Sequence, residues 1–217
     1  MKSVLPAFSF ALLLSSIALP ASADPFENIQ TYEREAFDRT ATQCDILAGH
    51  PSDPERVIDG GITREQMDKP AAIEACHEAL ERDPENPRLN YQLARAYGYS
   101  GLHEKGDLYR MKAVEAGYPQ SLFVFGYIRI EGWDGRPKDP CYGGELVRRS
   151  AHTGRFAGLV GFPHYVQTGA FDVCETYPAI DINEINGFLD EAEEKASDYY
   201  RRILVKSLKT HFAEEAP

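Results

Sequence analysis

The chain has 217 residues, 43% of them hydrophobic, and a formal net charge of −11 at pH 7. This length is enough for one domain with a hydrophobic core. The excess of carboxylates repels phosphate groups, so the composition argues against nucleic acid and anionic membranes as partners.

Residues 1–23 have the pattern of a signal peptide. Lys2 gives the positive start, an apolar run follows from Ala7 to Leu19, and Ala21-Ser22-Ala23 is typical of a cleavage site. A retained membrane anchor is the alternative, but the apolar run is shorter than the roughly 18–20 residues that cross a bilayer. We therefore predict cleavage after Ala23, export to the periplasm or beyond, and a single domain of residues 24–217 without stable membrane insertion.

The first part of this domain, residues 24–84, is predicted to hold two helices and a loop. Apolar residues at helical spacing over 24–48 predict one helix that ends at Gly49. Residues 50–69 are crowded with Pro, Gly and Asp, which indicates a long loop. Asp68 is placed to cap a second helix with Pro70 in its first turn, and Pro84 ends that helix.

Residues 85–172 carry a repeated pattern of helix, turn and antiparallel helix. Leu93, Ala94 and the turn glycine Gly101 reappear as Phe125, Gly126 and Gly132. Small residues at these positions allow two helices to pack closely. Each hairpin is apolar on two sides, so it must stack on a neighbouring hairpin, which predicts an all-α solenoid.

A third, less regular copy is predicted to begin near Phe156. Gly117 and Gly154 are 37 positions apart, and so are Gly132 and Gly169. Pro163 occupies the place of Gly126 in this copy, which predicts a helix that is kinked or starts late.

The last part, residues 173–217, is predicted to form one long capping helix and a tail. Asp181-Ile-Asn-Glu184 is a capping box that opens the longest helical pattern in the chain, and its apolar side continues from Ile185 towards Ile203 and Leu204. Such a helix would cover the last apolar face of the solenoid.

Four cysteines lie in the predicted mature chain: Cys44, Cys76, Cys141 and Cys174. An even number in an exported chain predicts two disulfides, although four cysteines allow three pairings. Because repeats in a solenoid touch only their neighbours, we favour Cys44–Cys76 and Cys141–Cys174. A metal or redox site is the alternative, but the chain has no Cys-x-x-Cys and no Cys/His cluster at ligand spacing.

The repeated helical pattern described above resembles the Sel-one-like repeat family, a relative of the tetratricopeptide repeats. The similarity is clearest over 121–157, where Phe125-Gly126-Tyr127, Gly132, the Pro137-Lys138-Asp139 loop and Ala151-x-x-Gly154 follow the family order. The resemblance implies a right-handed solenoid of antiparallel hairpins that binds protein partners on its concave face. The resemblance weakens at two positions. Arg129 stands where the family prefers an aromatic residue, and Gly143 stands where it prefers Ala.

The concave face is the predicted functional surface, since the first helix of each hairpin would line it. Tyr and Arg are the residue types that most often carry binding energy. The sequence left open whether Tyr91, Phe123 and Tyr127 line the groove or the core. Trp133 could anchor a partner or fold back onto its own hairpin. The predicted groove residues are Arg88, Tyr91, Arg95, Tyr99 and Tyr127, with Phe123 and Ile130 as further candidates.

No catalytic motif, cofactor loop or metal-ligand spacing occurs in the sequence, so we expect no catalytic residue, cofactor or metal. The predicted function is that of a periplasmic adaptor or regulatory module that binds a protein. The alternative is a cell-wall or β-lactam hydrolase of the cysteine-rich branch, although here the cysteines do not recur once per hairpin. A third possibility is a regulator that restrains a membrane sensor.

Overall fold

The computed structural model describes residues 24–214, so the predicted signal peptide lies outside the described residues. Within this range the chain is all helical and contains no strand. None of these helices combines the length and the apolarity that crossing a bilayer requires. The elements are η1 (Arg34–Ala36), α1 (Gln43–Ala48), α2 (Lys69–Arg82), α3 (Pro87–Tyr99), α4 (His103–Glu115), α5 (Pro119–Glu131), α6 (Pro140–His152), α7 (Phe156–Gln167), α8 (Ile182–Lys195) and α9 (Tyr199–Glu214).

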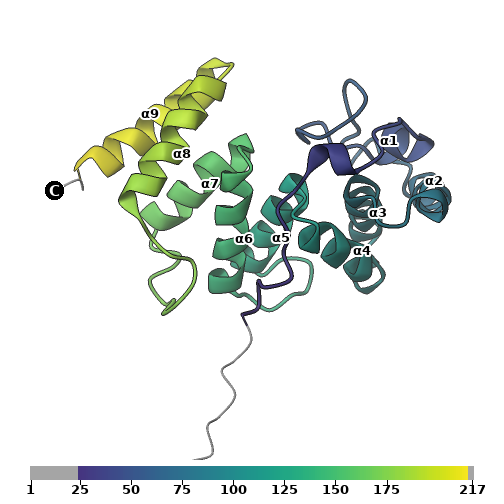
Figure 1. Ribbon diagram of the computed structural model, residues 1–217, viewed down its shortest axis with the longest axis horizontal. Coiled ribbons are helices and arrows are strands. Elements are labelled where there is room, and N and C mark those ends of the chain that lie inside the picture. The colour runs from purple at the N-terminus through teal and green to yellow at the C-terminus, as the bar shows by residue number, and fades with distance from the viewer. Residues whose placement is uncertain (1–23, 215–217) are drawn as a thin grey trace, which may run out of the picture.

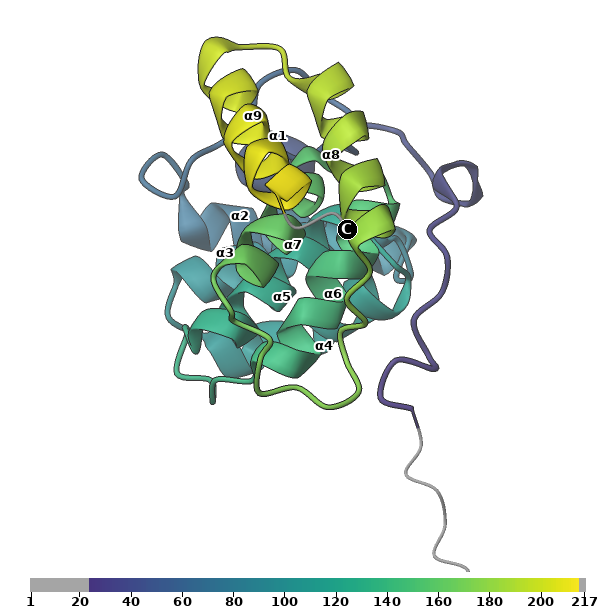
Figure 2. The ribbon, with the colours of Figure 1, turned by 90° about the vertical axis from the view of Figure 1, so that its left-hand side faces the viewer.

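Helices that follow one another in the sequence also pack against one another. Each helix from α1 to α9 contacts the next, and α1 also touches α3 while α7 touches α9. Figure 1 shows the resulting row, with α1 to α4 at one end, α5 to α7 in the middle and α8 with α9 at the other end. Figure 2 views the molecule from the α8–α9 end. Contacts of this kind make the core a series of clusters along the row.

Short-range signals in the sequence set the helix ends. Asp68 caps α2 as predicted, and its side chain accepts a hydrogen bond from the Ala71 backbone N–H at 3.2 Å. Gly132 ends α5 with φ of +74°, and Gly169 follows α7 with φ of +70°. This left-handed conformation is strained for residues with a side chain. The two glycines predicted to be equivalent therefore share one backbone conformation.

Two helices approach each other closely at Gly126 of α5 and Gly143 of α6. A Cβ added to Gly126 would lie 2.7 Å from the Gly143 carbonyl oxygen, and one added to Gly143 would lie 2.6 Å from the Gly126 carbonyl oxygen. The prediction that Gly126 permits close packing is confirmed. Gly143, where the resemblance to the repeat family weakens, is the second residue that allows this close packing.

The prediction of one helix over 24–48 is wrong. Only α1 and the single turn of η1 are helical there, and the rest runs as an extended segment across the other helices (Figure 1). Phe26 is 2% exposed and stacks on Tyr142 at 5.2 Å, and the Gln30 N–H donates to the Glu115 carbonyl at 2.8 Å. Phe26 is thus buried against other helices, and Ile29 and Tyr32 are half-buried, so tertiary contacts override the helical spacing of this segment.

The prediction of one long C-terminal helix is also wrong. The pattern divides at residues 196–198 into α8 and α9, which pack together as a pair. Asp198 accepts a hydrogen bond from the Arg201 backbone N–H at 3.0 Å, and such a local bond favours a helix start over a helix interior. Ile203 and Leu204, expected on the buried side, are 49% and 40% exposed, while Val205 and Leu208 are buried.

Pro163 does not delay its helix. α7 begins at Phe156, where the third copy was predicted to begin, and continues through Pro163 to Gln167. Leu159, whose carbonyl would accept from the missing N–H of residue 163, is fully buried in the core. The expectation of a late start is therefore wrong, and packing holds the helix together across the proline.

Candidate binding groove

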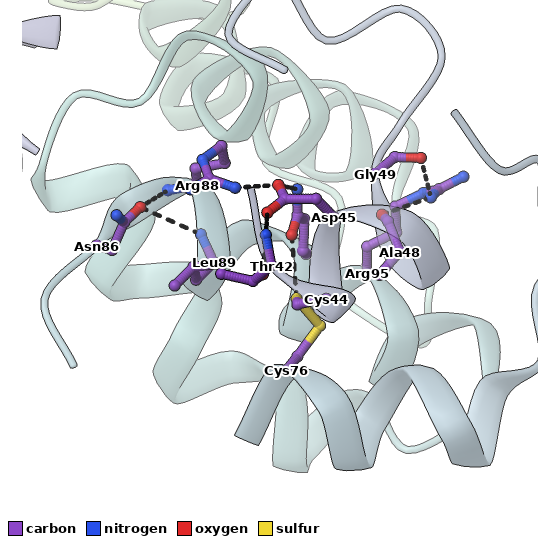
Figure 3. Close-up of a disulfide and its surroundings, with 11 residues drawn as sticks. Thr42, Cys44, Asp45, Ala48, Gly49, Cys76, Asn86, Arg88, Leu89 and Arg95 are labelled. Atoms are coloured by element: carbon purple, nitrogen blue, oxygen red, sulfur yellow. Dashed lines mark hydrogen bonds and ion pairs between the residues drawn. A yellow bond between two sulfur atoms is a disulfide. The ribbon is translucent and has the colours of Figure 1, made fainter. Parts of the chain in front are cut away.

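Helix α1 is fixed to α2 by a disulfide and to α3 by a buried ion pair (Figure 3). Cys44 on α1 is bonded to Cys76 on α2, with their Cα atoms 4.5 Å apart. Cys141 on α6 is bonded to Cys174, with Cα atoms 5.5 Å apart. Both predicted pairings are confirmed, and each links segments that are neighbours along the row of helices.

Arg88 is not a groove residue, which corrects the sequence-based assignment. Its side chain is 4% exposed and forms an ion pair with Asp45, which is 1% exposed. The Asp45 carboxylate also accepts from Gln92 Nε2 at 2.9 Å and from the Thr42 backbone N–H at 2.8 Å. Arg88 therefore joins α3 to the start of α1 and does not line the groove described below.

A cavity of about 470 Å³, which we call the groove, is lined by α3, α4, α5, the start of α7, the loop before Lys69 and the turn after α5. The predicted groove residues Tyr91, Arg95, Tyr99 and Tyr127 all line it, as does Phe123. Ile130 does not line it, because its side chain is 2% exposed in the core. The remaining lining residues are His50, Ser52, Arg64, Gly98, Arg110, Gln120, Val124, Ile128, Trp133, Asp134, Arg155 and Ala157.

Aromatic rings form the walls of the groove. Tyr99 has the guanidinium of Arg95 at 4.9 Å and that of Arg64 at 5.3 Å from its ring centre. On the α5 side, Tyr127 lies parallel to Phe123 with ring centres 6.3 Å apart. Trp133 meets Tyr127 edge-on at 4.8 Å and is 54% exposed. Trp133 therefore folds back onto its own hairpin and at the same time presents half of its surface at the rim.

Three buried arginines make the floor of the groove: Arg95, Arg110 and Arg155, which are 6%, 5% and 5% exposed. None of them forms an ion pair with a carboxylate within residues 24–214. Asp134 is the single carboxylate that lines the groove, and it lies 3.6 Å from His103. This patch is thus positively charged in a chain that is acidic as a whole.

The partners of these arginines differ. Arg95 donates to the backbone carbonyls of Ala48 at 2.8 Å, Gly49 at 3.3 Å and Ile62. Arg155 donates through Nε to Gln120 at 2.8 Å and lies 4.2 Å from the Phe123 ring centre, while its buried NH1 has no partner. The Arg110 guanidinium donates no hydrogen bond within the described range, and its Nε is buried without a partner.

Burial shifts the pKa values of several groove residues, but the groove keeps its positive charge. Burial lowers the pKa of Arg155 to about 10, and it also lowers the pKa of Arg110, to which the nearby Arg136 contributes. Arg155 therefore stays positive at neutral pH, and Arg110 does so because a guanidinium keeps its proton in proteins. Burial, together with Arg95 and Arg155, lowers the pKa of His50 to about 4, so this side chain is neutral there.

A buried carboxyl lies behind the floor. Asp53 is 1% exposed and accepts hydrogen bonds from the Tyr118 hydroxyl at 2.8 Å and from the Glu55 backbone N–H at 3.0 Å. Burial raises its pKa to about 6, and the charge of Arg155 opposes this shift. Asp53 is therefore close enough to Arg155 for their charges to interact, although the two form no ion pair.

A second cavity, of about 600 Å³, lies beneath the extended N-terminal segment, but its charges are already paired. Arg148 bonds Glu184 at 2.7 Å, Arg149 bonds Glu145 at 2.9 Å, and Arg34 bonds Glu55 at 2.6 Å. Because these acids neutralise its arginines, we interpret the ion pairs around this cavity as contacts that hold the fold together. The groove is the better candidate for a binding site.

Sequence reasoning missed Arg110, Arg155, Gln120 and the loop residue His50. Arg110 did carry a signal, because it stands four residues after Gly106 and four before Val114, on the buried stripe of α4. A charged residue on such a stripe needs either a buried partner or a ligand. The loop was predicted from its Pro, Gly and Asp content, but its contribution to the groove depends on contacts distant in sequence.

No set of three or more His, Cys, Asp or Glu side chains able to hold a metal ion occurs within residues 24–214. Comparisons of the chain with protein-family models, with curated proteins and with solved structures give no match.

Proposed function

We propose that this chain is an exported binding module of the Sel-one-like type, a short right-handed solenoid of antiparallel hairpins that presents its groove to a protein partner and performs no catalysis. The spacing of the turn glycines and the close contact at Gly126 support the repeat architecture. The two disulfides are compatible with an oxidising compartment such as the periplasm or the outside of the cell.

The groove itself is the observation that carries the proposal. It opens across α3, α5 and the start of α7, which are the first helices of successive hairpins. Tyr99, Tyr127 and Trp133 supply large, amphipathic rings at its walls and rim. Aromatic residues and arginines are enriched among the residues that dominate protein–protein binding energies. A groove with this lining suits an extended segment of another protein.

Site-specific photocrosslinking in the native envelope tests the proposal. A photoreactive residue in place of Tyr99 should capture a protein partner, and the substitution Tyr127→Ala in the same chain should reduce that capture. The matched control places the same photoreactive residue at Leu108, which is 63% exposed on α4 and does not line the groove. Equal capture from Leu108, or none from Tyr99, would contradict a partner-binding groove.

A further inference from the structure

The floor of the groove holds more positive charge than the protein itself neutralises. Four arginines and one aspartate line the groove as a whole, and that aspartate lies beside His103. A buried charge without a partner is costly, because the loss of hydration is not repaid by a local interaction. Arg110 carries such a group: the residue is 5% exposed, and its guanidinium makes no hydrogen bond or ion pair with any described residue.

The guanidinium of Arg110 lies at the groove, next to a residue that has no side chain. Its NH2 atom lies beside the backbone of Gly98 on α3, where an added Cβ would be 3.4 Å away. Both Gly98 and Arg110 line the cavity. The Phe125 ring, with its centre 5.7 Å from the guanidinium, offers no hydrogen-bond acceptor. The protein therefore offers this buried guanidinium the Phe125 ring and the charges of Asp134 and Asp107, but no hydrogen-bond acceptor.

Arg155 and Arg95 add to the same site. Arg155 uses Nε on Gln120 and keeps its NH1 without a partner. Gln120 in turn donates to the Tyr91 hydroxyl at 3.2 Å, which fixes the orientation of the amide and of the Arg155 side chain. The charges of Arg95, Arg110 and Arg155 all act on Tyr91, and all four residues line the groove.

We infer that the groove recognises a carboxylate group of a bound peptide, which the unpaired guanidinium groups of Arg110 and Arg155 hold at the floor while the aromatic walls contact the neighbouring residues. This inference deepens the proposed function and rests on it. The guanidinium fork matches a carboxylate in geometry as well as in charge. The carboxylate is either an acidic side chain or the free C-terminus of the peptide, and the experiment below separates the two.

The test uses the protein purified after export and four pools of short acetylated peptides whose other positions are randomised over uncharged residues. One pool carries a fixed Glu and a C-terminal amide, the second a fixed Gln and an amide, the third a Gln and a free C-terminal carboxylate, and the fourth a phosphoserine and an amide. Retention on the immobilised protein is measured by mass spectrometry. Trp133 is the single tryptophan and lines the groove, so its fluorescence reports binding without a label.

At least one carboxylate pool should be retained roughly tenfold better than the Gln amide pool, as expected for about 1.4 kcal/mol of added interaction. Arg110→Gln and Arg155→Gln should each bring this ratio close to one. The matched control, Arg82→Gln, removes the same charge from an exposed position on α2 outside the groove and should leave the ratio unchanged. If Arg155→Gln fails to fold, Arg110→Gln still decides, because Arg110 has no hydrogen bond to lose.

Other outcomes overturn the inference. Equal retention of the Glu and Gln amide pools and of the free-carboxylate pool, with a response of Trp133, would show a peptide groove without carboxylate recognition, so the proposed function would stand alone. Retention of the phosphoserine pool only would replace the carboxylate by phosphate. A carboxylate preference that survives both Arg110→Gln and Arg155→Gln would place the anion elsewhere. Failure to retain any pool would count against the inference and the proposed function together.

Discussion

Arg88 and Arg110 are buried to almost the same degree, with 4% and 5% of their surface exposed, but their surroundings differ. Arg88 forms an ion pair with Asp45 and donates to two backbone carbonyls, so its charge is fully used by the fold (Figure 3). Arg110 has no such partner. A paired buried charge fastens two segments, whereas an unpaired one at a cavity is a cost to the folded state that binding can recover.

The largest expected effect on the free energy of unfolding comes from removing Arg88, the arginine that is paired with Asp45. Arg88→Met should lower the free energy of unfolding by about 3–5 kcal/mol, because Asp45 would remain buried without its counter-charge. Urea unfolding monitored by circular dichroism measures this change. Adding Asp45→Asn removes the stranded charge and should recover part of the loss. A loss below about 1 kcal/mol, the range of exposed ion pairs, would contradict the contrast with Arg110.

The disulfide that holds α1 in place gives the next effect. Replacing Cys44 and Cys76 by alanine should cost about 3–4 kcal/mol, since the bond closes a loop of 32 residues in the unfolded chain. The Cys141–Cys174 bond spans 33 residues and is the matched control, with the same entropic effect. Thermal unfolding of the two double variants tests this. A markedly larger loss for Cys44/Cys76 would show that this bond also holds the Asp45 site together.

Asp53 predicts a pH dependence of smaller size. Its pKa of about 6 in the folded protein is above the ordinary value of 3.8, so the folded state binds more protons than the unfolded state between these values. Stability contributed by this group is present at low pH and is lost as pH rises from about 4 to about 6, by about 2–3 kcal/mol. Asp53→Asn should remove this part of the pH dependence. If the difference in unfolding free energy between wild type and variant stays constant over this pH range, the assignment of the pH dependence to Asp53 is contradicted.

The smallest effect has the opposite sign to the first. Arg110→Met should raise the free energy of unfolding by about 1 kcal/mol, because it removes a buried charge that has no partner. Arg82→Met, at an exposed position, should change it by less than about 0.5 kcal/mol. Urea unfolding of both variants measures the difference. A clear loss of stability for Arg110→Met would mean that Arg110 supports the fold, and its contrast with Arg88 would then disappear.

The sequence allowed many features to be predicted because they depend on neighbours in the chain. The cap at Asp68, the turn glycine Gly132 and the close contact at Gly126 follow from local backbone geometry. The two disulfides follow from the same logic, since helices adjacent in sequence pack together. Four of the five predicted groove residues line the groove, because they recur on the first helix of each hairpin.

The failures share one physical cause. The segment from 24 to 42 has helical spacing, but Phe26 is buried between Tyr142 and Tyr177, which are distant in the sequence. The C-terminal pattern divides because two helices side by side bury more apolar surface than one projecting helix, and Val205 rather than Leu204 faces the core. Periodicity records which residues are apolar, but it does not say what will cover them.

The sequence by itself determined the helical class, the repeat spacing, the helix caps and the pairing of the cysteines, all of which depend on contacts between neighbouring elements. Only the tertiary structure decided that Arg88 is neutralised by Asp45 while Arg110 and Arg155 stay unpaired at a cavity. The physical reason is that an arginine's role depends on the charge beside it in space, and the residues that supply or withhold that charge lie on other helices and on the loop from His50.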